Sequence, residues 1–328
     1  MSTAATIIIP THNHAQLLYA SVASALAQTI KDIEVFIVGD GVPDVTREIV
    51  LDLKRDTRVT FFDHPKGERH GETYRSDALR QAQGAIVCYL CDDDLFFPNH
   101  VEVMLDLLKS ADFVNALPIT VNKEGVRVYA VDLGNESVRQ LVTQIRYCRF
   151  GLSAMAHTLE FYKGLPFGWR TTPDNIPTDQ YMFQQCLSAA GVRATSSFRP
   201  TVLNFPDVSR KTLPITDRLQ ELEAWLARLQ DDQWRSAFED ELLSAALKTS
   251  AEELANLTYF QQVYEDSQRL ASDTLELAKR WEESANTQKA VAQSWEQQAI
   301  RLEHELAALR NSKTWKLRQR LRRILGAK

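Results

Sequence analysis

Strand-like and helix-like segments alternate through the first hundred residues, and this alternation constrains the fold more than any other feature of the chain. Runs of β-branched and aromatic residues typical of buried strands occupy residues 6–9, 33–38, 59–62 and 85–90. Apolar residues recur at helical spacing in residues 15–28, 45–53 and 73–82. Strands that alternate with helices predict an α/β fold with a mostly parallel, Rossmann-like sheet flanked by helices.

Polar residues follow three of the expected strands. Thr11 comes after the first strand, Asp40 ends the second, and Asp92, Asp93 and Asp94 follow the fourth. The carboxyl ends of parallel strands meet at one edge of a sheet, which is where such sheets bind ligands. These polar residues are therefore expected to converge on one site.

The aspartate triplet carries the clearest chemical signal. Neighbouring carboxylates repel one another and are costly to desolvate. A hard divalent cation such as Mg²⁺ or Mn²⁺ offsets both effects, because it prefers carboxylate oxygens and usually keeps a phosphate ligand. An isolated triplet would more often be a solvated turn that caps the helix starting near Pro98. The expected convergence with Thr11 and Asp40 favours the metal site instead.

The pattern loosens between residues 112 and 205. A strand at 113–117, a hairpin at 120–131, a helix at 179–190 and a strand at 192–198 are expected there. A Pro- and Gly-rich stretch at 164–177 predicts a long loop, and such loops in compact domains are usually functional or mobile. Residues 1–205 are predicted to form one domain.

The composition changes after Pro206. Glycine is absent between Gly191 and Gly326, and Leu, Ala, Glu, Gln and Arg dominate, so the remainder is expected to be helical. Residues 206–250 are predicted to be a helical region and 251–312 a long, coiled-coil-like helix with an interrupted heptad. That helix either self-associates, which we favour, or packs back on the N-terminal domain.

Residues 313–328 form a basic tail with seven Lys or Arg residues and no acid. The tail predicts an amphipathic helix, which could lie on an anionic lipid surface. A solvated helix end whose cations suit the helix dipole is an equally good interpretation.

Composition and charge exclude several classes of protein. The net charge of −5 over 328 residues argues against a nucleic-acid-binding protein. No apolar run approaches the roughly 18 residues of a membrane span. Residues 1–5 lack the features of a signal peptide, so a cytoplasmic location is expected. Cys88 and Cys91 are expected to face opposite sides of a strand and therefore to share no metal.

Five motifs in order make the first 200 residues resemble a family 2 nucleotide-sugar glycosyltransferase with the GT-A fold. They are Ile7–Asn13, Val38–Gly41, Tyr74–Ala78, Leu90–Asp94 and Pro177–Gln180. Three positions depart from the family pattern. Gly39 replaces the first of two acids, Cys91 replaces the leading acid of a D-x-D-D motif, and Thr178 replaces a glutamate.

The resemblance implies a role for each candidate residue. Asp93 would ligate the metal, Asp92 would lie near the ribose or the metal, and Asp94 would be a supporting acid or a helix cap. Thr11 and Asp40 would hold the nucleoside, and Arg75 the diphosphate. Asp179 would be the catalytic base, although an aspartate there also suits plain helix capping. Asp174 is the nearest alternative base.

The implied activity is inverting transfer of a sugar from a UDP- or dTDP-type donor to a hydroxyl acceptor, with Mn²⁺ or Mg²⁺ as cofactor. A glycan or lipid-linked acceptor, a role in cell-surface polysaccharide or lipopolysaccharide synthesis, and a place at the cytoplasmic face of the inner membrane are expected.

Two alternative functions stand beside this glycosyltransferase activity. A nucleotidyltransferase would usually show a Gly-rich loop after the first strand, which Pro10–Asn13 lacks. The other is a coiled-coil scaffold with a degenerate nucleotide-binding head.

Overall fold

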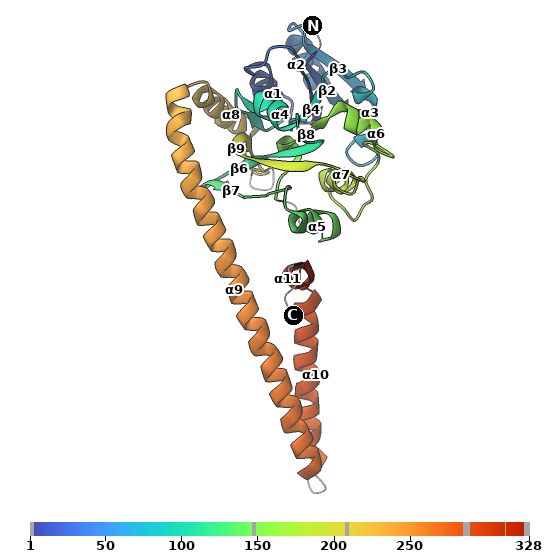
Figure 1. The fold of residues 1–328 in the computed structure, drawn as a ribbon, viewed down its shortest axis with the longest axis vertical. Helices are drawn as coiled ribbons and strands as arrows, with labels where there is room; N and C mark the ends of the chain where they lie inside the picture. Colours follow the sequence, from blue (N-terminus) through green and yellow to red (C-terminus); the bar gives the residue numbers. More distant parts are fainter. Residues whose placement is uncertain (1–2, 146–148, 207–209, 285–288, 312, 325–328) are drawn as a thin grey trace. The chain divides into compact units, whose positions relative to one another are not determined.

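The computed structural model describes residues 3–145, 149–206, 210–284, 289–311 and 313–324 (Figure 1). The chain divides into two compact units, Met1–Thr249 and Ser250–Lys328. The first unit holds a mixed sheet of nine strands in the order β3-β2-β1-β4-β8-β6-β9-β5, with β7 paired to β6. The predicted fold class is confirmed: a curled sheet with flanking helices is followed by a long C-terminal helix.

The N-terminal half of the sheet is parallel, as the sequence predicted. Its strands are β1 (Ala5–Thr11), β2 (Ile33–Asp40), β3 (Val59–His64) and β4 (Ile86–Tyr89). The connecting helices are α1 (Leu17–Leu26), α2 (Asp44–Leu53) and α3 (Glu72–Leu79). β1 pairs in parallel with both β2 and β4, and β2 pairs in parallel with β3. This register brings the carboxyl ends of β1, β2 and β4 to one edge.

The C-terminal half of the sheet mixes directions. Its strands are β5 (Leu95–Phe96), β6 (Phe113–Asn122), β7 (Gly125–Val128), β8 (Met155–Thr158) and β9 (Ala194–Asn204). Its helices are α4 (His100–Leu107), α5 (Glu136–Ile145), α6 (Leu159–Gly164) and α7 (Thr178–Leu187), with a short 3₁₀ turn at Leu152–Ala154. β8 lies between β4 and β6 and is antiparallel to both. The predicted hairpin is the β6–β7 pair.

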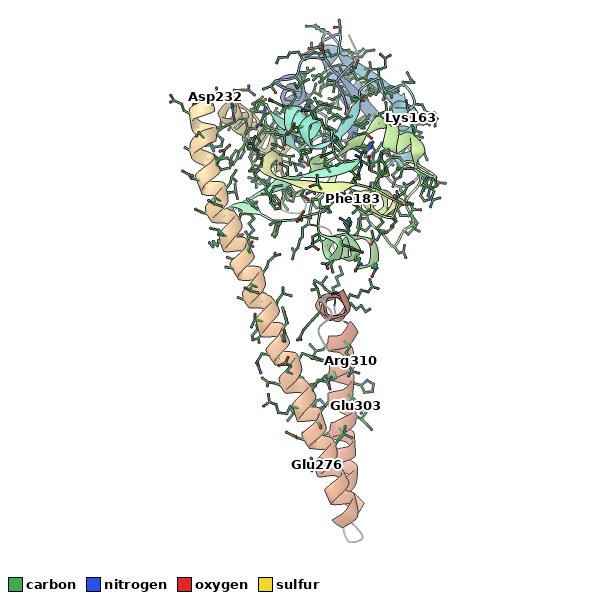
Figure 2. The ribbon with its side chains drawn as sticks, in the orientation of Figure 1. Lys163, Phe183, Asp232, Glu276, Glu303 and Arg310 are labelled. Carbon is green, nitrogen blue, oxygen red and sulfur yellow. The ribbon has the colours of Figure 1, made fainter. Side chains whose placement is uncertain are left out.

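A continuous core fills the space between the sheet and its helices. Side chains of β1, β2, β4 and β8 pack there with those of α1, α4 and α7, and Phe183 of α7 is fully buried (Figure 2). A second cluster forms where α8 (Ile215–Leu229) covers the sheet edge at β5, β6 and β9. Leu222 and Leu229 of α8 are buried in this cluster with Leu17 of α1. Helix α8 therefore shares a core with the sheet.

The second unit is helical. Helix α9 (Asp232–Ser284) enters it, and α10 (Lys289–Asn311) and α11 (Lys313–Ile324) follow. Arg318 of α11 lies over the Tyr264 ring of α9 at 5.3 Å and pairs with Glu265 at 3.8 Å. Figure 2 shows α10 alongside α9, with Glu276 on one helix and Glu303 on the other.

Two sequence predictions fall partly outside the described residues. The side chains of 277–297, which include much of the expected heptad, and of 322–328 in the basic tail are not described. Among the described helices, none combines the length and the apolar character needed to cross a bilayer.

Candidate active site

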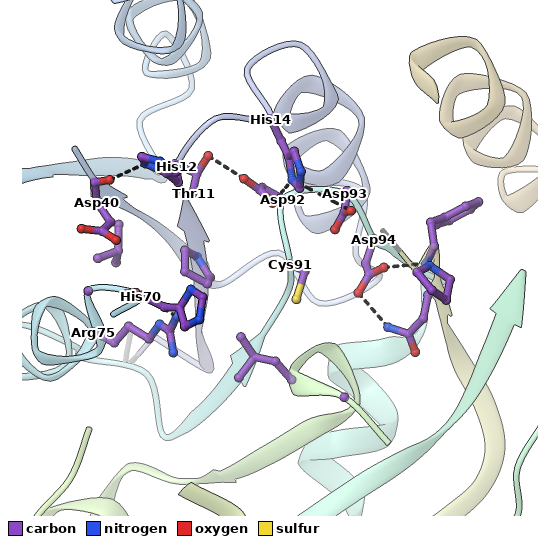
Figure 3. Close-up of a pocket in the computed structure, with 18 of the residues that line it drawn as sticks. Thr11, His12, His14, Asp40, His70, Arg75, Cys91, Asp92, Asp93 and Asp94 are labelled. Atoms are coloured by element: carbon purple, nitrogen blue, oxygen red, sulfur yellow. Dashed lines mark hydrogen bonds and ion pairs between the residues drawn. The ribbon is translucent and has the colours of Figure 1, made fainter. Parts of the chain in front are cut away.

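A cavity of about 870 Å³ opens at the carboxyl ends of β1, β2 and β4 (Figure 3). Its lining includes six of the seven residues singled out from the sequence: Thr11, Asp40, Arg75, Asp92, Asp93 and Asp94. Asp179, the seventh, is not among the lining residues. Parallel β-strands that end at one edge therefore bring the three expected polar clusters together.

The acidic triplet occupies a turn directly after β4. The backbone N–H of Asp94 donates to the carbonyl of Cys91 at 3.1 Å and closes the turn. The backbone N–H of Cys91 donates to the Ser153 hydroxyl at 2.9 Å, which ties the turn to the 3₁₀ turn before β8. Cys88 and Cys91 are both free thiols. The turn directs its three carboxylates to three different sets of partners.

Asp92 is held from two sides by the segment that follows β1. The Thr11 hydroxyl donates to Asp92 Oδ2 at 2.7 Å, and His14 Nδ1 lies 2.8 Å from Asp92 Oδ1. This hydrogen bond raises the pKa of the His14 imidazole. Thr11 thus reaches the cavity as predicted, but its hydroxyl proton is used to orient a carboxylate.

Asp93 forms a buried ion pair with Arg218 of α8, whose Nη2 lies 2.9 Å from Asp93 Oδ2. His14 Nδ1 lies 3.9 Å from the same oxygen. Burial, followed by the charges of Asp94 and Asp92, raises the pKa of the Asp93 carboxyl well above its ordinary range, while His14 and Arg218 oppose this rise. The positive charges of His14 and Arg218 therefore do not fully compensate the negative charge of this buried carboxylate.

Asp94 makes three hydrogen bonds with protein groups. The Ser153 hydroxyl and the Asn204 amide donate to its Oδ2 at 2.5 and 2.7 Å, and the backbone N–H of Phe205 donates to Oδ1 at 2.8 Å. Asp94 does not cap α4, which begins at His100 after Asn99. Its carboxylate instead joins the acidic turn to the end of β9.

A divalent cation fits this group of side chains. His14 Nδ1 and one carboxylate oxygen each from Asp92 and Asp93 all lie within 4.8 Å of one another. Two carboxylates and an imidazole form a donor set that suits Mn²⁺ and its first-row neighbours. Asp92 and Asp93 could thus hold an ion, whereas Asp94 has both oxygens engaged by the protein.

Asp40 lies at the opposite end of the cavity and is also engaged. Lys66 Nζ pairs with its Oδ2 at 2.6 Å, and the backbone N–H of Gly67 donates to its Oδ1 at 2.6 Å. Gly71, with φ +60°, packs so closely that a Cβ there would lie 2.6 Å from the Asp40 carboxyl carbon. The 66–71 segment therefore needs a glycine to close over Asp40.

Arg75 is a buried cation with spare hydrogen-bonding capacity. Its Cζ lies 4.7 Å from the centroid of the Trp169 ring, and its Nη2 donates to the His70 carbonyl at 3.3 Å. Its Nε and Nη1 have no hydrogen-bond partner among the residues that the structure describes. Burial lowers the pKa of this guanidinium. An anionic ligand in the cavity would supply the missing acceptors.

Asp179 lies in the first turn of α7 and close to Arg75. The Thr178 hydroxyl donates to Glu72 Oε1 at 2.9 Å, which ties the start of α7 to the start of α3. Burial raises the pKa of the Asp179 carboxyl, while backbone N–H groups and the nearby Arg75 and His70 oppose this rise. Its Oδ1 accepts from the backbone N–H of Gln180 at 2.8 Å. The residue thus contributes to the helix start and also faces a cationic neighbour.

Asp174, the alternative base, lies differently. Its side chain is 95% exposed and pairs with Arg69 at 2.8 Å. Arg69 also donates to the carbonyl of Ile176 at 3.4 Å. Asp174 therefore fastens the loop before α7 to the segment before α3.

Three residues of the site were not anticipated from the sequence: His14, Lys66 and Arg218. A signal for His14 was present, because it lies three residues beyond Thr11 at the same strand exit. Arg218 sits within an ordinary helical pattern, and nothing local marks it as a partner of Asp93.

The fold and this acid-lined edge are those of a GT-A glycosyltransferase domain. Residues 6–162 match the model of glycosyl transferase family 2. The sequence-based assignment is confirmed.

Curated relatives share part of the chain. An uncharacterized glycosyltransferase of Rickettsia bellii is 26% identical over 172 residues, which cover 52% of this chain and 24% of that protein. Another from Rickettsia typhi is 34% identical over 106 residues, or 32% of each chain. A UDP-Glc:alpha-D-GlcNAc-diphosphoundecaprenol beta-1,3-glucosyltransferase of Escherichia coli is 30% identical over 104 residues, 31% of this chain and 40% of the other. The matched part thus spans well under half of these relatives.

A solved structure shares the fold. The crystal structure of S. aureus TarS 1-349 in complex with UDP-GlcNAc superposes with a TM-score of 0.50 at 16% identity, covering 70% of this chain and 67% of that one. This likeness concerns the fold alone.

Proposed function

We propose that this chain is an inverting glycosyltransferase that moves a sugar from a UDP- or dTDP-type donor to a hydroxyl acceptor. One observation carries the proposal: the Asp92–Asp93 pair and the buried, partly unsatisfied guanidinium of Arg75 line the same cavity. Such a cavity suits a ligand that carries both anionic oxygens and a bound cation, which describes a metal-complexed diphosphate.

The donor would lie across the edge of the sheet. Asp40 and Thr11, which line the cavity, would contact its nucleoside, and Arg75 would hold its diphosphate oxygens through the charge of its guanidinium. Asp93 and Asp92 would hold Mn²⁺ or Mg²⁺, which neutralises the charge that develops on the leaving diphosphate. Asp94 supports the turn through Ser153 and Asn204.

The acceptor side of the reaction is assigned to Asp179. Its carboxylate would take the proton of the acceptor hydroxyl while the acceptor oxygen bonds to the anomeric carbon. The bond from that carbon to the diphosphate breaks on the opposite face, so the configuration inverts. Burial favours this role, because the raised pKa makes the carboxylate a stronger base. The Thr178–Glu72 hydrogen bond holds α7 beside Arg75 and so beside the donor.

Two relatives suggest the acceptor class. The E. coli enzyme and a Campylobacter jejuni enzyme, GalNAc(5)-diNAcBac-PP-undecaprenol beta-1,3-glucosyltransferase, are named for lipid-linked saccharide acceptors. We infer a glycan or lipid-linked acceptor for this chain too, in the synthesis of a cell-surface polysaccharide or lipopolysaccharide.

Peripheral attachment to the cytoplasmic face of a membrane through the basic tail fits that acceptor. Lys313, Lys316 and Arg320 of α11 are exposed, whereas Arg318 packs against α9. The helical unit would also provide a surface for self-association, and residues 1–205 would form the catalytic domain.

Ligand-dependent thermal stability tests the donor site. UDP or dTDP is expected to raise the melting temperature only when Mn²⁺ or Mg²⁺ is present, because binding to the folded state alone stabilises it. Asp93→Asn should abolish this shift. A melting temperature that no nucleoside diphosphate changes, with either metal, would overturn the donor site.

Asp179→Asn tests the base. The variant should keep the metal-dependent nucleotide shift and lose turnover by about 10²–10⁴-fold, because it binds the donor but takes no proton. Asp174→Asn is the matched control, since it lies five residues earlier and is exposed. Loss of turnover in the Asp174 variant alone would identify Asp174, rather than Asp179, as the catalytic base.

A further inference from the structure

His14, which lines the cavity, contacts the acidic turn directly. Its Nδ1 is 2.8 Å from Asp92 Oδ1 and 3.9 Å from Asp93 Oδ2. His12, two residues earlier, turns away and bonds through Nδ1 to the carbonyl of Asp40 at 2.6 Å (Figure 3). The two histidines therefore serve opposite ends of the cavity.

The spacing of these three atoms suits shared coordination of one ion. Adjacent ligands of an octahedral ion with bonds of about 2.1 Å lie roughly 3 Å apart. The distance of 2.8 Å from His14 Nδ1 to Asp92 Oδ1 lies near that value, and the distance of 3.9 Å to Asp93 Oδ2 lies between it and the roughly 4.2 Å that separates opposite ligands. The Thr11 hydroxyl binds Asp92 Oδ2, so Asp92 Oδ1 is the oxygen left facing His14.

Independent features indicate that a cation and an anion belong here. Asp93 Oδ2 already accepts a buried cation, the Arg218 guanidinium. Arg75, which is 5% exposed, lines the same cavity, and its Nε and Nη1 have no hydrogen-bond partner among the described residues. An ion between His14, Asp92 and Asp93 would therefore have room for an anionic ligand held by Arg75.

We propose that His14 is itself a ligand of the divalent ion, through Nδ1, beside Asp92 and Asp93. The inference rests on the proposed function, because it takes the donor's metal to lie at this turn. An imidazole nitrogen suits first-row transition ions, whereas Mg²⁺ prefers carboxylate and water oxygens. His14 consequently makes the site select Mn²⁺ over Mg²⁺, so the strand exit after β1 determines metal preference.

Direct metal binding to the full chain, without donor or acceptor, tests this. Isothermal titration with MnCl₂ and with MgCl₂ should show Mn²⁺ bound at least roughly tenfold more tightly. His14→Gln should weaken Mn²⁺ binding by roughly tenfold or more and change Mg²⁺ binding far less, so the preference collapses. His12→Gln is the matched control and should leave both metal affinities unchanged. Metal-free thermal melting of each variant checks that the fold is retained.

Pulsed electron paramagnetic resonance of bound Mn²⁺ provides the decisive reading. A directly bonded imidazole produces a nitrogen hyperfine coupling, which should appear in the wild type, persist in His12→Gln and vanish in His14→Gln. Mn²⁺ that binds the wild type and is lost in Asp93→Asn, yet shows no nitrogen coupling, would overturn the role of His14 and leave the proposed function standing. A wild type that binds neither metal, with or without UDP, would instead overturn the proposed function.

Discussion

Arg218 and Asp93 form a buried ion pair at 2.9 Å although 125 residues separate them in the chain. The side chains are 9% and 12% exposed, so neither charge is well solvated. The arginine comes from α8, outside the segment that matches the family model. A cation from the helical region thus occupies an oxygen that the divalent ion would use.

Removing this arginine is expected to free Asp93 for the metal. Arg218→Met should tighten Mn²⁺ binding by roughly tenfold, which corresponds to about 1.4 kcal/mol. The same change should cost about 3 kcal/mol of stability in the metal-free chain, because it leaves a buried carboxylate uncompensated. Isothermal titration and urea denaturation measure the two effects. Arg228→Met, which alters a cation over the Trp225 ring on the same helix, is the control. Weaker Mn²⁺ binding would show that Arg218 supports the metal.

Asp94→Asn is expected to damage stability more than metal binding. The Ser153 hydroxyl, the Asn204 amide and the Phe205 N–H all donate to this carboxylate, and an asparagine can accept from only part of that set. The loss should be about 1–3 kcal/mol in urea denaturation. Mn²⁺ affinity should fall much less than in Asp93→Asn. Equal loss of affinity in both variants would make Asp94 a direct ligand.

The Arg75→Met variant separates the effect of this arginine on nucleotide binding from its effect on stability. Two of its guanidinium nitrogens lack partners in the described chain, so the substitution should leave the melting temperature of the ligand-free protein unchanged or higher. UDP affinity in the presence of Mn²⁺ should fall by roughly 10- to 100-fold, because charge-assisted hydrogen bonds to the diphosphate are lost. Fluorescence titration with UDP checks the affinity. Unaltered affinity would place the diphosphate away from Arg75.

Two buried histidines should each contribute a loss of stability in mild acid. Burial lowers the pKa of His100 to about 3 and of His157 to about 4, against about 6.5 in an unfolded chain. Below pH 6.5 these histidines therefore bind protons in the unfolded state but not in the folded state, and their contribution to the free energy of unfolding falls until the folded pKa values are reached. Each histidine contributes up to about 1.4 kcal/mol per pH unit.

Urea denaturation between pH 7 and pH 5 measures this slope. His100→Gln should flatten it by the share of one histidine, because the replacement does not titrate. An identical slope in the His100 variant would show that His100 is protonated in the folded state.

The parallel half of the sheet was predictable because each of its strands has a local signature. β1, β2 and β4 are runs of buried β-branched residues, and the sequence therefore placed Thr11, Asp40 and Asp92 at one edge. Strand β8 has no such signature. Its four residues, Met155–Thr158, include His157, whose Nε2 bonds to the Tyr89 hydroxyl at 2.8 Å. Partners that lie far away in sequence make this strand stable.

The same distinction applies to the site. Residues grouped by a strand end, such as Asp92 and Asp93, could be predicted together because the backbone alone brings them close. The partners of Asp94 at Asn204 and of Asp93 at Arg218 depend on the tertiary packing of β9 and α8. The spacing of apolar residues predicts that α8 has an apolar face, but it does not predict which surface of the protein that face covers. The roles assigned to the seven candidate residues all stay predictions.

The position of α8 has a consequence for dividing the protein into parts. Leu222 and Leu229 are buried in one cluster with Leu17 and Leu95, and the acidic turn is hydrogen-bonded to the chain at Phe205, before this helix. A chain cut after Pro206 would expose an apolar surface and also lose the cation that Asp93 binds. Such a fragment is expected to aggregate and to respond differently to metal. Activity measured on it would describe an altered enzyme, so a useful truncation should retain α8.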